Sequence, residues 1–401
     1  MGTRFSALAA LATAGLFFLY EFVARIEPSI ATGEISDDLG LSATGFGLIS
    51  SLFFWTYAPM QLVVGLLLDR YGLRRFVLPA ILACASGTAM VGLASTPVVA
   101  GAGRVLTGFG ASFAFVSALF VVNHWFAPQR FALLSGLVNA IGMTGAAIGA
   151  VVLTEFVSVF GWRQTFVGTG LAGLVLFAFA VVVLHDPPRQ AEDKGTLTVL
   201  RTLGAVITQG RIWLFAVVGA LMYIPINVFG GLWGNAELIA DHHLSSMAAE
   251  TAIAAMFFGM AAGSVAAGAL SDWLGNRKWI MLAGSLAAAM IWTLLLYSES
   301  GSPVLLNGML FAAGLFGGAQ MLTFAGARDG QPPSVVGTIV AFVNMIGIGA
   351  ALLFQPLVGL ILDLTGGLFA EALSVLPAAL LAACVLILFV RSETVKGDAR
   401  P

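Results

Sequence analysis

Two short stretches of sequence decide the fold, because the second repeats the first about half a chain later. The first reads Gly65-Leu-Leu-Leu-Asp69-Arg70-Tyr-Gly72-Leu-Arg74-Arg75, and the second reads Gly268-Ala-Leu-Ser-Asp272-Trp-Leu-Gly275-Asn-Arg277-Lys278. Both follow the pattern G-x-x-x-D-x-x-G-x-[RK]-[RK], and 203 residues separate them. A second pair of matching stretches, 138–142 and 343–347, is offset by 205 residues. Two independent matches at nearly the same offset indicate that the chain is built from a duplicated unit.

The composition places this duplicated chain in a membrane. Of its 401 residues, 59% are hydrophobic and 9% are charged, whereas soluble domains carry about 25% charged residues. So few charges exclude a soluble enzyme, a nucleic-acid-binding protein and a disordered scaffold. The two cysteines, Cys84 and Cys384, lie in apolar runs without neighbouring ligand residues, so neither a disulfide framework nor a metal site is expected.

The apolar segments predict an all-α integral membrane protein, since a spanning helix needs about 20 apolar residues. Twelve segments qualify: 7–30, 43–68, 76–95, 97–121, 131–157, 164–185, 212–238, 247–271, 279–298, 303–326, 335–362 and 369–391. Only the connection 186–211 is long and polar. We therefore expect two pseudo-symmetric six-helix bundles, 1–185 and 212–401, joined by the linker 186–211.

The placement of lysine and arginine predicts the orientation in the membrane. If both termini are cytoplasmic, 15 of the 18 basic residues lie in cytoplasmic segments, as the positive-inside rule requires. Arg163 is the one basic residue in an outer loop, and Arg25 and Arg104 fall within predicted spans. The reverse orientation violates the rule almost everywhere, so we expect a multi-pass protein of the cytoplasmic membrane with both termini inside the cell.

These features resemble the major facilitator superfamily of secondary transporters. The twelve spans, the central linker and the loop that begins at Gly65 are hallmarks of that family, and the second copy of the loop departs from the family pattern at Trp273. Arg104-Val-Leu-Thr-Gly108-Phe-Gly110 in the fourth span resembles the family's R-x-x-x-G-x-G signature. The fifth span lacks the proline of the drug-antiporter motif G-P-x-x-G-G, which weighs against multidrug efflux. Glu21 and Arg25 in the first span, with Arg104 in the fourth, look more like the superfamily's anion/proton symporters.

The resemblance also implies a role for the two repeated loops. They are expected to form a conformational gate made of Gly65, Asp69, Arg70, Gly72, Arg74, Arg75, Gly268, Asp272, Gly275, Arg277 and Lys278. A carboxylate is favoured at a helix N-terminus, where unpaired N–H groups and the helix dipole attract an anion. Asp69 is expected to meet the start of the eleventh span near Ser334, and Asp272 the start of the fifth span near Arg130. Both contacts belong to the state in which the cytoplasmic side is shut.

Three charged residues within spans are the main candidates for chemistry, because an intramembrane charge costs roughly 2.5–3.5 kcal/mol to insert. Glu21 and Arg25 are four residues apart and share one helix face. Arg104 is expected at a similar depth, so the two arginines form a fork for a carboxylate or phosphate. Glu21 beside them is the expected proton carrier. The alternative is a structural ion pair of Glu21 with Arg25 or Arg104 that locks the N-terminal bundle.

The C-terminal half offers neutral polar groups instead of charges. The resemblance places spans 1, 4, 7 and 10 around a central cavity, and Tyr20, Tyr223 and Asn227 are the first candidates for contact with the body of a substrate. Each of them also has the alternative role of packing helices together. Glu155 is expected to form a structural pair with Arg163, and the adjacent His242 and His243 are expected to lie in a solvated outer turn.

Together these residues predict a monomeric secondary transporter that moves a small organic anion by proton-coupled symport and alternating access. We expect a small-molecule substrate, protons as the coupling ion, the lipid bilayer as surroundings, no cofactor and no nucleic acid. One alternative is efflux of an amphiphilic compound or siderophore, and another is a non-transporting membrane sensor. The chain contains no nucleotide-binding lysine motif and no catalytic triad, so we expect no enzymatic activity.

Overall fold

The computed structural model describes residues 2–126, 131–186, 203–297 and 302–390. Twelve helices within these ranges are long and apolar enough to cross a membrane. They are Ser6–Ile30, Ala43–Gly65, Arg74–Gly92, Pro97–Trp125, Ile141–Phe160, Trp162–Val183, Gly210–Ala240, Ser246–Ser271, Arg277–Leu296, Pro303–Arg328, Val335–Thr365 and Phe369–Leu388. Each overlaps one predicted span, which confirms the predicted all-α membrane fold.

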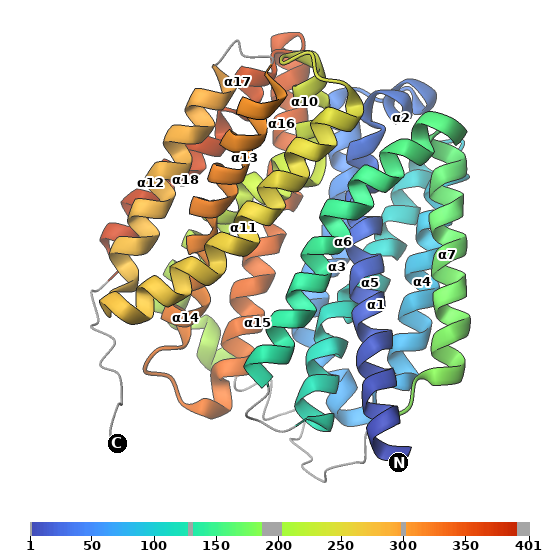
Figure 1. Cartoon of the computed structure of the whole chain (residues 1–401), viewed down its shortest axis with the longest axis vertical. Helices are drawn as coiled ribbons and strands as arrows, with labels where there is room; N and C mark the ends of the chain where they lie inside the picture. Colours follow the sequence, from blue (N-terminus) through green and yellow to red (C-terminus); the bar gives the residue numbers. More distant parts are fainter. Residues whose placement is uncertain (1, 127–130, 187–202, 298–301, 391–401) are drawn as a thin grey trace.

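The helices gather in chain order on two sides of the molecule (Figure 1). The N-terminal side contains α1 (Gly2–Ile30), α2 (Thr32–Leu39), α3 (Ala43–Tyr71), α4 (Arg74–Gly92), α5 (Pro97–Trp125), α6 (Phe131–Phe160) and α7 (Trp162–Val183). The C-terminal side contains α9 (Gly210–Ile224), η2 (Pro225–Trp233), α10 (Gly234–Ala240), α11 (Ser246–Leu274), α12 (Arg277–Leu296), α13 (Pro303–Gly317), η3 (Gly318–Met321), α14 (Leu322–Arg328), α15 (Pro333–Gly349), α16 (Ala351–Thr365), α17 (Phe369–Leu373) and α18 (Val375–Leu388). Most of the predicted linker 186–211 lies outside the described residues.

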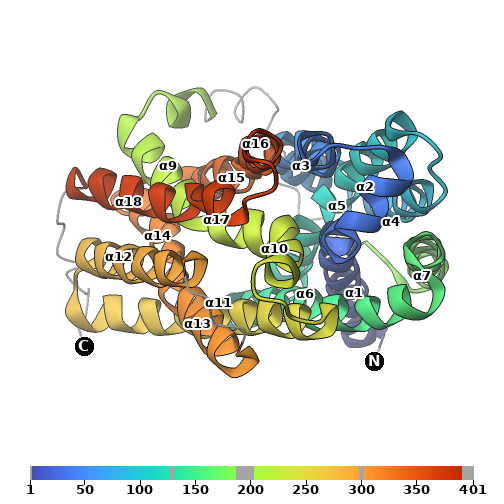
Figure 2. The ribbon, with the colours of Figure 1, turned by 90° about the horizontal axis from the view of Figure 1, so that it is seen from above.

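The two sides meet along a seam that is visible from above (Figure 2), where α3 lies beside α15 and α16. On the other side of α1, α6 packs against α11, and α1 itself contacts η2. Because α1 begins and α18 ends toward the same end of the molecule, we call that end the terminal face and the opposite end the distal face. The seam thus runs from one face to the other, with α1 near its middle.

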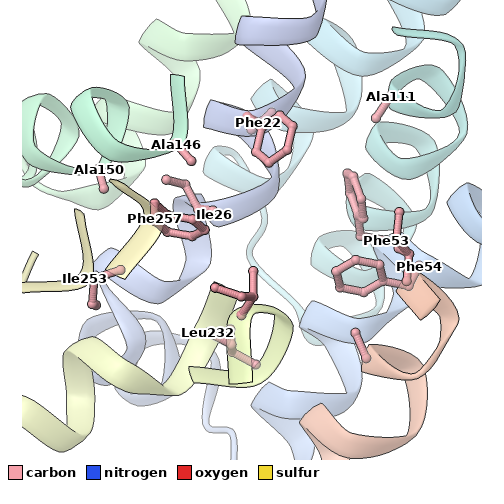
Figure 3. Packing of buried hydrophobic residues seen from close by; sticks show 14 of the residues in the cluster. Phe22, Ile26, Phe53, Phe54, Ala111, Ala146, Ala150, Leu232, Ile253 and Phe257 are labelled. Atoms are coloured by element: carbon pink, nitrogen blue, oxygen red, sulfur yellow. The ribbon is translucent and has the colours of Figure 1, made fainter. Parts of the chain in front are cut away.

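The buried apolar residues show where the seam is closed. One large cluster includes residues from both sides, such as Ile26 and Ala150 with Leu232, Ile253 and Phe257 (Figure 3). A second cluster consists of buried residues of the C-terminal side alone, drawn from the terminal-face ends of α9, α12, α15 and α18. The two sides therefore share a core toward the distal face, whereas the C-terminal side keeps a separate core near the terminal face.

Glycines in α5 explain why the R-x-x-x-G-x-G pattern suits this position. A side chain on Gly108 would overlap the backbone carbonyl of Phe53 in α3, and one on Gly110 would overlap the carbonyl of Ala80 in α4. The two glycines let α5 approach its neighbours backbone to backbone, as small residues do in membrane helix packing. Arg104, one turn before Gly108, consequently points toward α3 and α1.

Several helices are interrupted rather than straight. Proline lies inside α1, α3, α4 and α16, at Pro28, Pro59, Pro79 and Pro356. The seventh span passes through a π-helical segment, η2, before it continues as α10. Proline removes the N–H that would bond to the carbonyl four residues earlier, and π segments inside helices are frequent at functional sites. The interruptions in α1, α3, α16 and the seventh span belong to helices that contact the opposite side, whereas α4 packs mainly against α5 and α7 of its own side.

Candidate functional site

A buried ion pair lies on α1 at the seam. The Arg25 guanidinium donates from Nε to Glu21 Oε1 at 2.8 Å, and its Nη2 also donates to that oxygen. Glu21 is 0% exposed and Arg25 is 7% exposed. The second carboxylate oxygen, Oε2, has no hydrogen-bond partner among the described residues. The predicted i, i+4 neighbours therefore do meet, and they leave one carboxylate oxygen unused.

Aromatic rings surround the Arg25 guanidinium. Its Cζ lies 4.5 Å from the ring centroid of Phe22, 5.6 Å from that of Phe53 and 4.8 Å from that of Tyr57. Ring faces attract a cation, and the attraction strengthens where water is excluded. Sequence reasoning missed Tyr57, because a tyrosine in an apolar span shows no sign of which side it faces. Cation–π contacts therefore stabilise Arg25 in addition to its bonds to Glu21.

Tyr223 brings the C-terminal side to this pair. It lies at the end of α9, is partly exposed, and interacts electrostatically with Arg25 and Glu21. It also interacts with Tyr57. Two tyrosines from opposite sides of the seam thus face one ion pair.

The other predicted arginine, Arg104, binds backbone carbonyls. Its Nη1 donates to Ala24 O at 2.9 Å, and its Nη2 donates to Arg25 O at 3.2 Å and Ser50 O at 3.4 Å. Pro28 lies four residues after Ala24 and has no N–H, so the Ala24 carbonyl is free to accept from Arg104. The structure therefore brings the Arg104 guanidinium from α5 to the backbone of α1 at Arg25, but it gives Arg104 a role in holding α1, α3 and α5 together.

Glu27 is a second buried carboxylate that the sequence reasoning did not select. It is 2% exposed and interacts electrostatically with Arg104, while its Oε1 lacks a partner in the described part of the chain. In the sequence, Glu27 and Pro28 together read as the end of a span near the membrane surface. The structure continues α1 to Ile30 and buries Glu27 within one turn of Ala24 and Arg25, whose carbonyls accept from Arg104, and near Thr169 of α7.

Tyr20 lies away from this cluster. Its hydroxyl packs over Gly173 of α7, close to Ala85 of α4, and it makes no hydrogen bond among the described residues. Neighbouring residues of a helix are rotated by about 100°, so Tyr20 faces the interior of the N-terminal side while Glu21 faces the seam. The structure does not bring Tyr20 together with the other predicted substrate residues.

Asn227 belongs to a polar cluster inside the C-terminal side. Gln355 Nε2 donates to the backbone carbonyl of Asn227 at 2.9 Å, and Trp233 Nε1 donates to the backbone carbonyl of Gln355 at 3.1 Å. Asn227 Nδ2 reaches Gly347 O at 3.5 Å. Gln355 Oε1 is buried without a partner in the described ranges. The cluster ties the π-helical segment to α15 and α16, with one acceptor still free.

The repeated loops fasten each side internally. Arg74 donates to the carbonyls of Leu184 and Val181 at the end of α7, at 2.8 and 2.6 Å, and its own N–H donates to Asp186 at 2.9 Å. In the second copy, Lys278 donates to Leu388 O at the end of α18 at 2.7 Å. Arg70 and Arg75 lie over the ring of Tyr71, and Gly65 is partly buried in α3.

The other predicted gate residues in the two repeated loops are glycines, a basic residue and two aspartates. Gly72 and Gly275 end α3 and α11 with φ of 93° and 64°, which glycine adopts without strain. Gly268 lies in α11 with open space where a side chain would be, and Arg277 pairs with Asp329 at 3.0 Å. The side chains of Asp69, Asp272 and Ser334 and the whole of Arg130 lie outside the described part of the structure. The contacts expected for the two aspartates therefore lie outside it as well.

Two expectations about the outer loops are wrong. Arg163 pairs with Asp38 rather than Glu155, with Nε 3.2 Å from Asp38 Oδ2, and Trp162 Nε1 donates to the same oxygen at 2.9 Å. The helix α2, which lies between the first two predicted spans, places Asp38 there. His242 is 3% exposed rather than solvated, and its Nε2 lies 3.3 Å from Glu237 Oε1.

Comparison with known proteins agrees with this architecture. Residues 7–233 match the family model of the Major Facilitator Superfamily. The chain is 27% identical to the hexuronate transporter of Bacillus subtilis (strain 168), over 92% of this chain and 91% of that protein. It is 25% identical to the probable galactarate/D-glucarate transporter GarP of Escherichia coli (strain K12), over 83% of each.

A solved structure shares the fold. A bacterial homolog of the human lysosomal transporter Spinster, in an inward-facing and unoccupied conformation, superposes with a TM-score of 0.73 at 17% identity. The match covers 96% of this chain and 95% of that one. The family match over more than half of the sequence, the twelve helices and the two repeated loops lead to one conclusion. This chain is a membrane transporter of the Major Facilitator Superfamily.

Proposed function

We propose that this transporter carries a small organic anion across the cytoplasmic membrane together with a proton. The observation that carries the proposal is the buried Glu21–Arg25 pair at the seam, opposite Tyr223. A cation that both sides of the molecule can reach is suited to a carboxylate that bridges them. A neighbouring carboxylate with a free oxygen is suited to a proton.

The pair supports a simple coupling scheme. A substrate carboxylate competes with Glu21 for the Arg25 guanidinium, since both are anions seeking the same charge-assisted hydrogen bonds. Glu21 then loses its cation at a fully buried position, where an unpaired charge is costly, and neutralises by taking up a proton. Release of the anion restores the pair and expels the proton. Binding of anion and proton are thereby linked at Arg25.

The class of anion that fits best is a hydroxylated carboxylate such as a sugar acid. The printed names of the relatives, hexuronate and galactarate/D-glucarate transporters, favour it. The C-terminal side supports it with the unpaired acceptor of Gln355 and with Asn227 and Tyr223, which suit hydroxyl groups. The ion pair of Glu21 and Arg25 lies on the N-terminal side, whereas the neutral Tyr223, Asn227 and Gln355 lie on the C-terminal side. This arrangement suits an acid with a polar body.

Transport requires the two sides of the molecule to move relative to each other. We propose that 1–185 and 212–401 rock as two six-helix units in a monomer, with both termini cytoplasmic and the repeated loops as the cytoplasmic gate. The core shared toward the distal face then corresponds to an outside that is shut. Under this orientation the structure is an inward-facing state.

Purified protein in liposomes with an internal pH dye provides the test. Hexuronates and aldarates are added outside, with neutral hexoses as a chemical control, and internal acidification is recorded. We expect acidification with sugar acids that is abolished in Glu21→Gln, while exchange of radiolabelled substrate persists. Glu155→Gln serves as a matched control, because Glu155 is an exposed glutamate at the end of α6. Anion uptake without acidification, or a Glu21→Gln variant that still acidifies, would refute the coupling scheme.

A further inference from the structure

Asp363 near the end of α16 binds the beginning of α3, a helix from the other side of the seam. Its Oδ1 accepts the backbone N–H of Ala43 at 2.9 Å, and its Oδ2 accepts the N–H of Thr44 at 2.9 Å. The Thr44 hydroxyl also donates to Oδ2. The first N–H groups of a helix have no partner inside it, and the helix dipole is positive there. One carboxylate from α16 therefore satisfies two such groups on α3.

The surroundings of this contact are packed as closely as two helices allow. A side chain on Gly47 of α3 would overlap the Gln355 carbonyl, and one on Gly359 of α16 would overlap the Ala43 carbonyl. The ring of Phe46, next to Gly47 in α3, meets the ring of Trp233 in η2 edge to face, with centroids 5.7 Å apart. Ser42 accepts the N–H of Gly45 as an ordinary cap within α3. The remaining N–H groups are thus left to Asp363.

We propose that Asp363 is a latch that holds the distal face shut and that opens in each transport cycle. The contact joins α3 to α16 across the seam, so the distal face opens only if the two helices separate there. Separation leaves the N–H groups of Ala43 and Thr44 without their acceptor and exposes the glycine-packed surface. The latch accordingly favours the distal-closed state by the free energy of one charged helix cap.

The position of the latch mirrors the gate expected at the other face. Asp69 lies in the last turn of α3, at the terminal face, and the family resemblance predicts that it meets the start of the eleventh span when that face is shut. The eleventh span comprises α15 and α16. Asp363 lies at its distal end and caps the start of α3. The same two helices would then carry a carboxylate at each face, with donor and acceptor helices exchanged. When the two sides rock, the cap of Asp363 on α3 breaks as the distal face opens, and the predicted cap of Asp69 on the eleventh span forms as the terminal face shuts.

The latch can be tested without knowing the substrate. Cys84 and Cys384 are replaced by alanine, and Ser51→Cys is introduced as a probe. Ser51 is 0% exposed and lies one turn after Gly47, on the face that α16 covers. The protein is placed in lipid nanodiscs, and its reaction rate with a water-soluble maleimide is measured. Labelling then reports how often the distal seam opens.

Asp363→Asn keeps the size of the side chain but removes its charge. We expect the labelling rate of the Ser51→Cys probe to rise about fivefold, equivalent to about 1 kcal/mol for the loss of a charged cap. Asp38→Asn is the matched control, since Asp38 joins α2 to α7 within one side, and its rate should stay within twofold of the parent. Thr44→Val removes only the hydroxyl contact and should give a smaller increase than Asp363→Asn.

Two results would overturn the proposal. An Asp363→Asn variant with the melting temperature of the parent and an unchanged labelling rate would show that the contact carries no preference between states. An equal increase in Asp38→Asn would show that any loss of charge at the distal face loosens the protein. If Asp363→Asn fails to fold, Thr44→Val decides the question alone, because an unchanged rate in that folded variant also contradicts the latch.

Discussion

Arg104 and Pro28 should prove energetically coupled, although one lies on α5 and the other on α1. Pro28 deprives the Ala24 carbonyl of its helical partner, and Arg104 Nη1 supplies the missing donor at 2.9 Å. Arg104→Met therefore leaves a buried carbonyl unsatisfied, which costs about 1–3 kcal/mol. The carbonyls of Arg25 and Ser50, the other acceptors of Arg104, precede non-proline residues by four positions, so helical N–H groups remain available to them.

Replacing the proline should rescue that variant. Pro28→Ala restores an N–H four residues after Ala24, so the Arg104→Met/Pro28→Ala double variant should recover about 1–2 kcal/mol of the lost stability. Recovery stays partial, because the electrostatic attraction between Arg104 and Glu27 is still lost. The assay is the free energy of unfolding of the four proteins in detergent micelles by titration with a denaturing surfactant.

Pro59→Ala in α3 is the matched control, because Pro59 frees a different carbonyl that Arg104 does not bind. Its combination with Arg104→Met should be additive within about 0.5 kcal/mol. Additivity of Pro28→Ala with Arg104→Met would refute the reasoning and show that Arg104 does not act through the carbonyl. Rescue of Arg104→Met by Glu27→Gln instead would assign the role of Arg104 to charge balance.

Three further outcomes follow from the same contacts. Tyr20→Phe should leave stability within about 0.5 kcal/mol and transport unchanged, as thermal melting and uptake will check, because the hydroxyl makes no hydrogen bond among the described residues. Gly359→Ala should push α3 away from α16 and raise maleimide labelling of the Ser51→Cys probe at least as much as Asp363→Asn does; an unchanged rate would contradict the close packing. Glu250→Leu should lose about 1–3 kcal/mol in surfactant unfolding, since Asn235 Nδ2 donates to Glu250 at 2.7 Å with both side chains buried; a neutral result would show that the pair is dispensable.

Local patterns were enough for the number and limits of the spanning helices. Twenty apolar residues in a row dictate a spanning helix whatever surrounds them, because a bilayer leaves backbone groups no other partner. The proximity of Glu21 and Arg25 was equally local, since residues four apart on a helix are neighbours. The repeat of the Gly65 loop at Gly268 was sufficient to predict a duplicated transporter.

Which way each side chain faces was decided by the tertiary structure. Tyr20 and Glu21 are adjacent in sequence, yet one packs against Gly173 and the other faces the seam. An apolar span has no polar face to reveal its orientation, because lipid and protein interior are both apolar. Periodicity therefore carries little information in such a chain.

Contacts between distant segments likewise had no signature in the sequence. The capture of the Ala24 carbonyl by Arg104 depends on α5 crossing α1 at the turn that Pro28 interrupts. The capping of α3 by Asp363 joins residues 320 positions apart. A carboxylate or guanidinium shows in the sequence that some partner must exist, since buried charges require one. Only the packing of the helices determines which backbone group that partner is.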